Sequence, residues 1–208
     1  MHDNAPVAPL DPSMLEAAND TLVRAFMDDP MFGWVFPDPA ARARGLRRLN
    51  RVPLEYGRRY GYLRQSDKGR CVAIWIPPGE PMSPGRMIRC GMLGVPLRTG
   101  LGPLARFGAA NGVMDKIHKR HMNGPHWELL IVAVDPELQG RGRGIALVRD
   151  GLTRADESGL PCYLNTNTPA NLPFYEHLGF TVLEQATLGK GGPPAWAMRR
   201  DATGHAPT

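Results

Sequence analysis

A chain of 208 residues with 42% hydrophobic and 22% charged residues has ordinary globular values and room for a sizeable core, which excludes a disordered or low-complexity protein. The net charge of +5 suits an acidic ligand or nucleic acid and decides neither. Cys71, Cys90 and Cys162 lack metal-ligand spacing and cannot all pair, which favours a reducing compartment. Because no signal-peptide core and no long apolar run is present, we expect a cytoplasmic protein without membrane attachment.

The N-terminal part predicts a short tail followed by helices. Residues 1–10 contain prolines and little apolar pattern, so we expect a flexible tail. A single domain over residues 11–201 then begins with a helix that ends near Asp29-Pro30. A second helical region covers residues 39–60, where Pro53 should kink or break it. We interpret its basic face as solvated, since no nucleic-acid-binding module accompanies it.

Aromatic residues and a hairpin come next. The segment 31–38 is aromatic and turn-rich, and Phe32 and Trp34 either pack as a satellite of the core or help to wall a substrate pocket. Residues 61–65 and 71–76 read as two short strands joined by a polar turn, which predicts a hairpin.

Residues 80–125 form a long segment rich in Gly, Pro and Met. They carry short helical patterns at 86–92, 101–107 and 113–122. A segment of this length inside a compact domain usually has structure or a function of its own. We therefore interpret it as a helical insertion that binds the substrate, with helical filler of the core as the alternative.

Three histidines lie at the end of this insertion. His118 and His121 are three residues apart on an expected helix, with His126 nearby, and that spacing can hold a metal. No carboxylate or thiol completes the set, and neighbouring lysine and arginine residues add positive charge. We predict no metal site.

The stretch from Val132 to Ile145 is the part around which the chain is organised. An apolar strand over residues 127–134 is ended by Asp135-Pro136, and a helical pattern resumes at Ile145 after a glycine-rich turn. Gly140, Gly142 and Gly144 let the backbone come close to a bulky ligand, and Arg141 and Arg143 add attraction for an anion. A strand, a glycine-rich turn and a helix in this order favour a phosphate or pyrophosphate site, with an ordinary solvated loop as the alternative.

The C-terminal part continues as a regular alternation. We expect a helix over 141–157, a strand over 161–166, a helix that starts after Asn167 and ends at Gly179, and strands over 180–185 and 195–199. The order βαβαββ from residue 127 predicts an α/β (α+β) layer structure with helices on the faces of one mixed sheet. Residues 202–208 are expected to form a flexible tail.

The glycine-rich turn also excludes two phosphate motifs and matches a third. A nucleotide P-loop needs Gly-Lys-Ser/Thr, and a dinucleotide fingerprint needs G-x-G-x-x-G; neither is present. Residues 139–144 instead match Q-x-x-G-x-G. With VDPELQGRGRG and NLPFYEHLGF, this chain resembles the GNAT superfamily of acetyl-CoA-dependent N-acetyltransferases over residues 127–200. It is most similar to the puromycin N-acetyltransferase group, through AFMDDP, CVAIWIPP and LPCYLNTNTPANLPFYEHLGFTV.

The resemblance implies the GNAT fold and a binding site for acetyl-CoA. Backbone groups of Val132, Ala133 and Val134 would pair with the pantetheine arm, and the Val132 amide would stabilise the oxyanion that forms during attack. Asn171 would bond the cofactor's amide region, and Tyr175 would lie beside the sulfur. The amides expected to hold the pyrophosphate are those of Gln139, Gly140, Arg141, Gly142, Arg143, Gly144 and Ile145.

The resemblance also implies an acid and a base. Tyr175 could protonate the leaving thiolate, with a core aromatic as the alternative. Glu128 lies 139 − 128 = 11 positions before Gln139, the spacing at which the histone-acetyltransferase branch has its catalytic glutamate. Partial burial would raise the pKa of Glu128; a solvated glutamate at a strand end is the alternative. The puromycin group differs here, with an apolar residue at position 128 and a glutamate where this chain has Asn165, which is therefore a candidate substrate-binding residue.

Two function classes follow. The first is an N-acetyltransferase that acts on a small amine, such as an aminonucleoside antibiotic or a related metabolite. The second is a non-catalytic acyl-CoA-binding module, since a fold does not guarantee its reaction. A protein-lysine acceptor is a third reading. We expect a monomer or homodimer that binds no nucleic acid.

Overall fold

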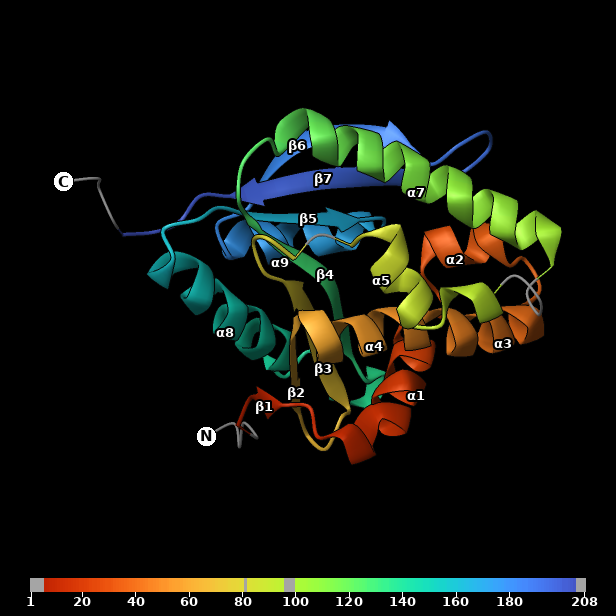
Figure 1. Cartoon of the computed structure of the whole chain (residues 1–208), viewed down its shortest axis with the longest axis horizontal. Helices are drawn as coiled ribbons and strands as arrows, with labels where there is room; N and C mark the ends of the chain where they lie inside the picture. Colours follow the sequence, from red (N-terminus) through yellow and green to blue (C-terminus); the bar gives the residue numbers. More distant parts are fainter. Residues whose placement is uncertain (1–5, 81, 96–99, 205–208) are drawn as a thin grey trace.

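The computed structural model describes residues 6–80, 82–95 and 100–204. Its centre is a seven-stranded sheet in the order β1-β2-β3-β4-β5-β7-β6, in which only β4 and β5 run parallel (Figure 1). The strands are β1 Ala8–Pro9, β2 Tyr62–Ser66, β3 Cys71–Ile76, β4 Trp127–Val134, β5 Cys162–Thr166, β6 Thr181–Thr187 and β7 Pro194–Arg200. The fold class expected from the sequence, a mixed sheet flanked by helices, is confirmed.

Helices cover both faces of the sheet. One face carries α8 and α9; the other carries α1 and α4, and α7 crosses it over β6 and β7 (Figure 1). The α-helices are α1 Leu15–Ala25, α2 Pro30–Val35, α3 Pro39–Leu49, α4 Arg51–Tyr60, α5 Pro84–Arg89, α7 Leu101–His121, α8 Arg143–Glu157 and α9 Leu172–His177. Short 3-10 turns are η1 Pro12–Met14, η2 Met92–Gly94, η3 Pro136–Leu138 and η4 Pro169–Asn171.

Strand β3 shows how the sequence forms a two-sided core. Every residue of CVAIWI is buried. Ala73 and Trp75 pack with α8, while Val72 and Ile74 pack with α1 and α4, because alternate side chains of a strand leave on opposite faces. A continuous apolar run is therefore what a central strand under helices on both sides requires.

Two expected boundaries are wrong. The N-terminal tail was predicted over residues 1–10, yet Ala8–Pro9 pairs with β2 and Leu10 is buried. Proline is compatible with this place because β1 is an edge strand and needs few ladder donors. The helical region 39–60 does break, but at Asn50, so that Pro53 lies in the first turn of α4, where a missing N–H costs little.

The insertion over residues 80–125 is more continuous than its patterns suggest. Two of the expected helices are one, α7, which runs through Gly108 and Gly112 without interruption. Its apolar residues pack on α2 and on the edge of the sheet, so this helix completes part of the core. Residues 81 and 96–99 of the insertion, and residues 1–5 and 205–208 of the predicted tails, lie outside the described residues. Within the described ranges, no helix is long and apolar enough to cross a bilayer.

A close approach between α8 and β3 gives a stability prediction. A Cβ at Gly151 would lie 2.2 Å from the Trp75 ring, which is fully buried. Gly151→Ala should therefore lower the free energy of unfolding by about 1–3 kcal/mol, because the ring has no room to move. Gly108→Ala is the matched control, since a Cβ there meets nothing within 4 Å and alanine favours the helix. Chemical denaturation of both variants measures the difference; equal stabilities would contradict the prediction.

Candidate active site

The strand pair β4 and β5 opens at the centre of the sheet. Only residues 127–129 of β4 pair with β5, at residues 162–164. The next residues of β4, up to Val134, keep β3 as their neighbour, while β5 continues beside β7 (Figure 1). The edge of β4 beyond Leu129 is thus left without a strand partner, and its backbone groups are available to a ligand with amide groups of its own.

A bulge in β4 decides which side chains face which helices. Ile131 pairs with Ile74 and Leu129 pairs with Trp75, so Leu130 is an extra residue. After the bulge, Val132 and Val134 face α8, while Glu128 before it faces the side covered by α7. The two sides of the opening therefore present different chemistry.

The glycine-rich turn connects β4 to α8 as predicted. Gly140 and Gly142 have φ of 72° and 77°, the left-handed region that favours glycine. Helix α8 begins at Arg143 with Gly142 as its N-cap and without a side-chain cap, so the first N–H groups of the helix remain for an anion. Arg141 is exposed beside this end, whereas Arg143 forms an ion pair with Asp67 at 3.2 Å.

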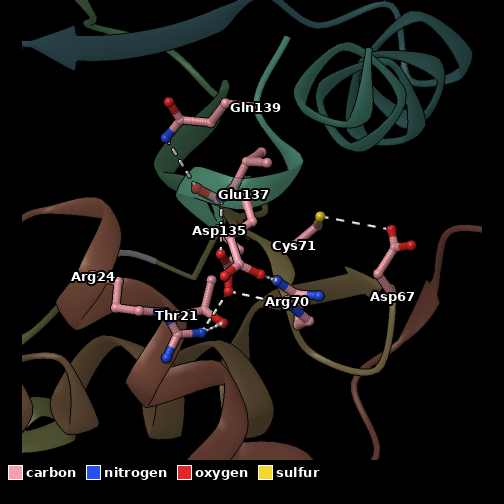
Figure 2. Close-up of polar contacts among 9 residues, drawn as sticks. Thr21, Arg24, Asp67, Arg70, Cys71, Asp135, Glu137 and Gln139 are labelled. Carbon is pink, nitrogen blue, oxygen red and sulfur yellow. Dashed lines mark hydrogen bonds and ion pairs between the residues drawn. The ribbon is translucent and has the colours of Figure 1, made fainter. Parts of the chain in front are cut away.

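Asp135 anchors the start of the turn (Figure 2). Its buried carboxylate accepts hydrogen bonds from Arg24 of α1 at 2.6 Å and from Arg70 at 3.2 Å. It also accepts from the amide of Glu137 at 3.1 Å, and Gln139 Nε2 donates to Val134 O at 3.2 Å. Burial alone would raise the pKa of Asp135, but the hydrogen bonds from the two arginines lower it to about 2. This network fixes the direction in which the chain leaves β4.

Tyr175 is buried in the core on the face of the sheet that α8 covers. Its ring packs edge-on against Phe174 and Phe180, with centroids 5.0 and 6.0 Å apart. It belongs to the same apolar cluster as Val132 and Val134. Burial raises the pKa of the phenol far above its ordinary value, so the hydroxyl stays protonated, and no hydrogen bond to it is found in the part of the chain that the structure describes.

Glu128 lies on the other side of the opening. It is the parallel neighbour of Tyr163 and the antiparallel neighbour of Ile76. Glu128 as a whole is partly exposed. The surrounding protein nevertheless removes water from its carboxyl group, and this burial raises the pKa of the carboxyl to about 7. No described residue forms a hydrogen bond or ion pair with this carboxylate, so it is available to a ligand.

The remaining predicted side chains come from η4, β5 and α2. Asn171 is exposed at the end of η4 and donates to Thr166 Oγ1 at 3.4 Å. Asn165 accepts a hydrogen bond from the Tyr163 hydroxyl. Phe32 stacks on Phe107 of α7 with centroids 6.5 Å apart, and Trp34 packs in the same cluster. These two aromatic residues are thus partly core, and both keep some exposed area.

The other residues predicted to bind the cofactor lie on β4 and at the start of α8. Ala133 is buried on the α1 face, and Ile145 packs into the cluster that holds Tyr175. A Cβ at Gly144 would touch Phe174 at 3.5 Å, so this glycine also keeps α8 close to α9.

The partners of Asp135 were missed by reasoning from sequence. Arg24 and Arg70 bind Asp135 across 111 and 65 residues of chain, and no local spacing could have indicated them.

The three histidines considered in the sequence have different partners. His118 Nε2 lies 2.7 Å from His126 Nε2, while His121 pairs with Glu184. The described residues contain no group of three His, Cys, Asp or Glu able to hold a metal ion.

Comparison with known proteins agrees with this geometry. Residues 106–182 match the acetyltransferase (GNAT) domain family. A mycothiol acetyltransferase of Nocardiopsis dassonvillei is 41% identical over 61 residues, which are 28% of this chain and 18% of that protein. An uncharacterized N-acetyltransferase of Schizosaccharomyces pombe is 25% identical over 177 residues, 81% of this chain and 71% of that protein.

A solved structure is similar over nearly the whole length. It is described as histone acetyltransferase HPA2 and related acetyltransferase from Corynebacterium glutamicum, with 24% identity, a TM-score of 0.70, and coverage of 97% of this chain and 98% of that one. The likeness establishes the fold. The family match over residues 106–182, the glycine-rich turn and the opened sheet agree with one another, and this chain is thus similar to the acetyltransferase (GNAT) domain family.

Proposed function

We propose that this protein is an acetyl-CoA-dependent N-acetyltransferase in which a primary amine attacks the thioester directly. The observation that carries the proposal is the edge of β4 left unpaired beyond Leu129, which leads straight to the uncapped N-terminus of α8. A strand edge suits the amides of a pantetheine arm, and a helix N-terminus suits a pyrophosphate. The residues present therefore fit coenzyme A along its length.

The donor would be held mainly by backbone groups. Residues 132–134 bind the pantetheine amides as a strand would, and the turn at residues 139–145 binds the pyrophosphate with its N–H groups. Asn171, exposed at the end of η4, supplies a side-chain amide for the pantetheine. The Val132 amide, on the unpaired edge, stabilises the oxyanion that forms on the thioester carbonyl.

Each side of the opening supplies the group for one of the two proton transfers. From the α7 side, Glu128 takes the one proton that the nitrogen of the neutral amine loses as it forms the new C–N bond. From the α8 side, the Tyr175 hydroxyl protonates the sulfur as the C–S bond breaks. Solvent later returns a proton to Tyr175 and takes one from Glu128. The products are the N-acetyl amine and free CoA thiol.

The acceptor would be a small-molecule amine. Phe32 and Trp34 offer an aromatic wall beside α7, which suits an acceptor of the aminonucleoside type to which the puromycin N-acetyltransferase resemblance points. The chain spans about a fifth of the curated mycothiol acetyltransferase that it matches first, so that relative gives no guide to the acceptor. A protein lysine is the second candidate acceptor.

Release of CoA thiol from acetyl-CoA tests the activity. The amine panel contains puromycin, aminoglycosides, polyamines, amino acids and a lysine peptide. Rapid release with one class supports the transferase and names its acceptor. Tight binding of acetyl-CoA with no release above background for any amine would favour a non-catalytic acyl-CoA-binding module.

The turn provides a prediction about donor binding. A Cβ at Gly142 meets no protein atom within 4 Å, so apart from the backbone strain of its positive φ a methyl group there would obstruct only a bound ligand. Gly142→Ala should raise the KM for acetyl-CoA roughly tenfold, about 1.4 kcal/mol of lost binding. Gly159→Ala at the other end of α8 is the control, because Gly159 has φ of 65° and equally open surroundings. Both variants should lose similar stability, and a KM that rises equally in both would refute the assignment of the turn.

A further inference from the structure

A row of polar side chains on β5 lies under α7 at the point where the sheet opens. Tyr163 and Asn165 are two residues apart and therefore share a face of the strand. Glu128 is the neighbour of Tyr163 across the parallel pair, so all three face α7. Strand spacing places the Cα atoms of Glu128 and Asn165 about 8 Å apart, within the span of one small molecule.

The Tyr163 ring is held in place from above. His118 of α7 stacks on it with centroids 4.4 Å apart and 9° between the planes. His118 Nε2 lies 2.7 Å from His126 Nε2, and His126 Nδ1 donates to Gly124 O at 2.7 Å. Burial, followed by repulsion from His126, lowers the pKa of His118 to about 4, so the imidazole is neutral at working pH. Tyr163 is thus fixed by a neutral, stacked partner.

The fixed Tyr163 hydroxyl in turn orients Asn165. Burial raises the pKa of Tyr163 well above its ordinary value, so the hydroxyl keeps its proton and donates it to Asn165 Oδ1 at 2.9 Å. The amide oxygen of Asn165 is therefore occupied, and the amide nitrogen is the group left to a ligand. That nitrogen has no protein partner among the described residues, and Asn165 keeps some exposed area.

We propose that Asn165 Nδ2 is a specificity-determining donor that selects acceptor amines carrying a carbonyl or hydroxyl oxygen close to the amine. The inference rests on the proposed function. Glu128 takes the proton of the amine while Asn165 binds the oxygen, so one molecule satisfies both groups. An alkylamine without such an oxygen leaves the amide N–H unpaired when the site closes, which disfavours it. A free amino acid is disfavoured for a different reason: its negatively charged carboxylate would lie near the carboxylate of Glu128, and the two charges repel each other.

A matched pair of acceptors tests the proposal. Phenylalaninamide and 2-phenylethylamine have the same ring and amine, and only the first has a carbonyl beside the amine. We expect kcat/KM from CoA release to favour the amide at least tenfold in the natural protein. Asn165→Ala should remove most of this preference by weakening the amide substrate, with the KM for acetyl-CoA unchanged.

Two further variants separate specificity from folding. Asn165→Asp can still accept from Tyr163 but can no longer donate, so it should lose the preference while the thermal unfolding midpoint is kept. Asn123→Ala, in the exposed loop before β4, is the control and should keep the preference. Equal use of the two amines by the natural protein, or a preference unchanged in both Asn165 variants, would overturn the proposal and leave the transferase standing. Failure of every amine would instead remove the proposed function itself.

Discussion

Replacement of Tyr175 by phenylalanine should lower kcat roughly 100-fold while the affinity for acetyl-CoA is kept. The change removes only the hydroxyl, and the contacts with Phe174 and Phe180 that hold the ring remain. General acids contribute on the order of 10²–10⁴ in rate. The buried phenol stays protonated at neutral pH because its pKa is raised, so it is ready to donate to the leaving sulfur.

The measurement compares kcat from CoA release with the dissociation constant of acetyl-CoA from calorimetry. Tyr62→Phe is a matched control, since the Tyr62 ring packs edge-on against Trp127 at the far end of β4 and removal of its hydroxyl should leave kcat unchanged. A Tyr175→Phe variant with natural kcat would reduce Tyr175 to a core aromatic residue.

Replacement of Glu128 by glutamine should have a comparable effect that depends on pH. The pKa of Glu128 is raised to about 7 by burial, and the base acts only when deprotonated. The natural protein should therefore lose activity tenfold per unit below pH 7 relative to the variant. The ratio of the two kcat/KM values, measured at each pH with one amine, removes the titration of the amine itself. It should rise with pH and become constant above about pH 8, at roughly 100 or more.

Glu128→Gln should lower activity but raise stability above neutral pH. A carboxyl whose pKa in the folded protein is about 7, above its ordinary pKa of 4.5, binds protons more tightly in the folded state, so the folded protein loses stability as pH rises from 4.5 to 7. The shift corresponds to about 3 kcal/mol. Glu128→Gln should therefore be more stable than the natural protein at pH 8 and similar to it at pH 4.5. Glu176→Gln, an exposed position on α9, should show neither effect. A pH-independent activity ratio would show that another group is the base.

The bulge at Leu130 explains why these two variants probe different sides of the site. Without the extra residue, strict alternation along β4 would place Glu128, Leu130, Val132 and Val134 on one face. The bulge changes the face between Glu128 and Val132. Because of it, the proposed base and the proposed acid approach the opening from opposite sides, as direct transfer between two bound molecules requires.

Elements with a local cause could be predicted from the sequence. Asp135-Pro136 must end β4, glycines at 140 and 142 permit positive φ, and the apolar period then returns in α8; the structure places strand, turn and helix at these residues. The order of strands and helices after residue 127 was equally predictable, since each has its own period and its own end signals.

The way in which these elements meet depends on long-range packing and could not be predicted. Leu130 and Ile131 are both apolar, so the pattern of β4 could not reveal the bulge. The separation of β4 from β5 depends on pairing partners rather than on either strand's sequence. The arginines that bind Asp135 come from α1 and from the turn before β3, and such long-range contacts leave no period or spacing in the chain. Local sequence signals thus define the strand, turn and helix of the candidate site. Tertiary packing determines on which side of the sheet Glu128, Asn165 and Tyr175 lie.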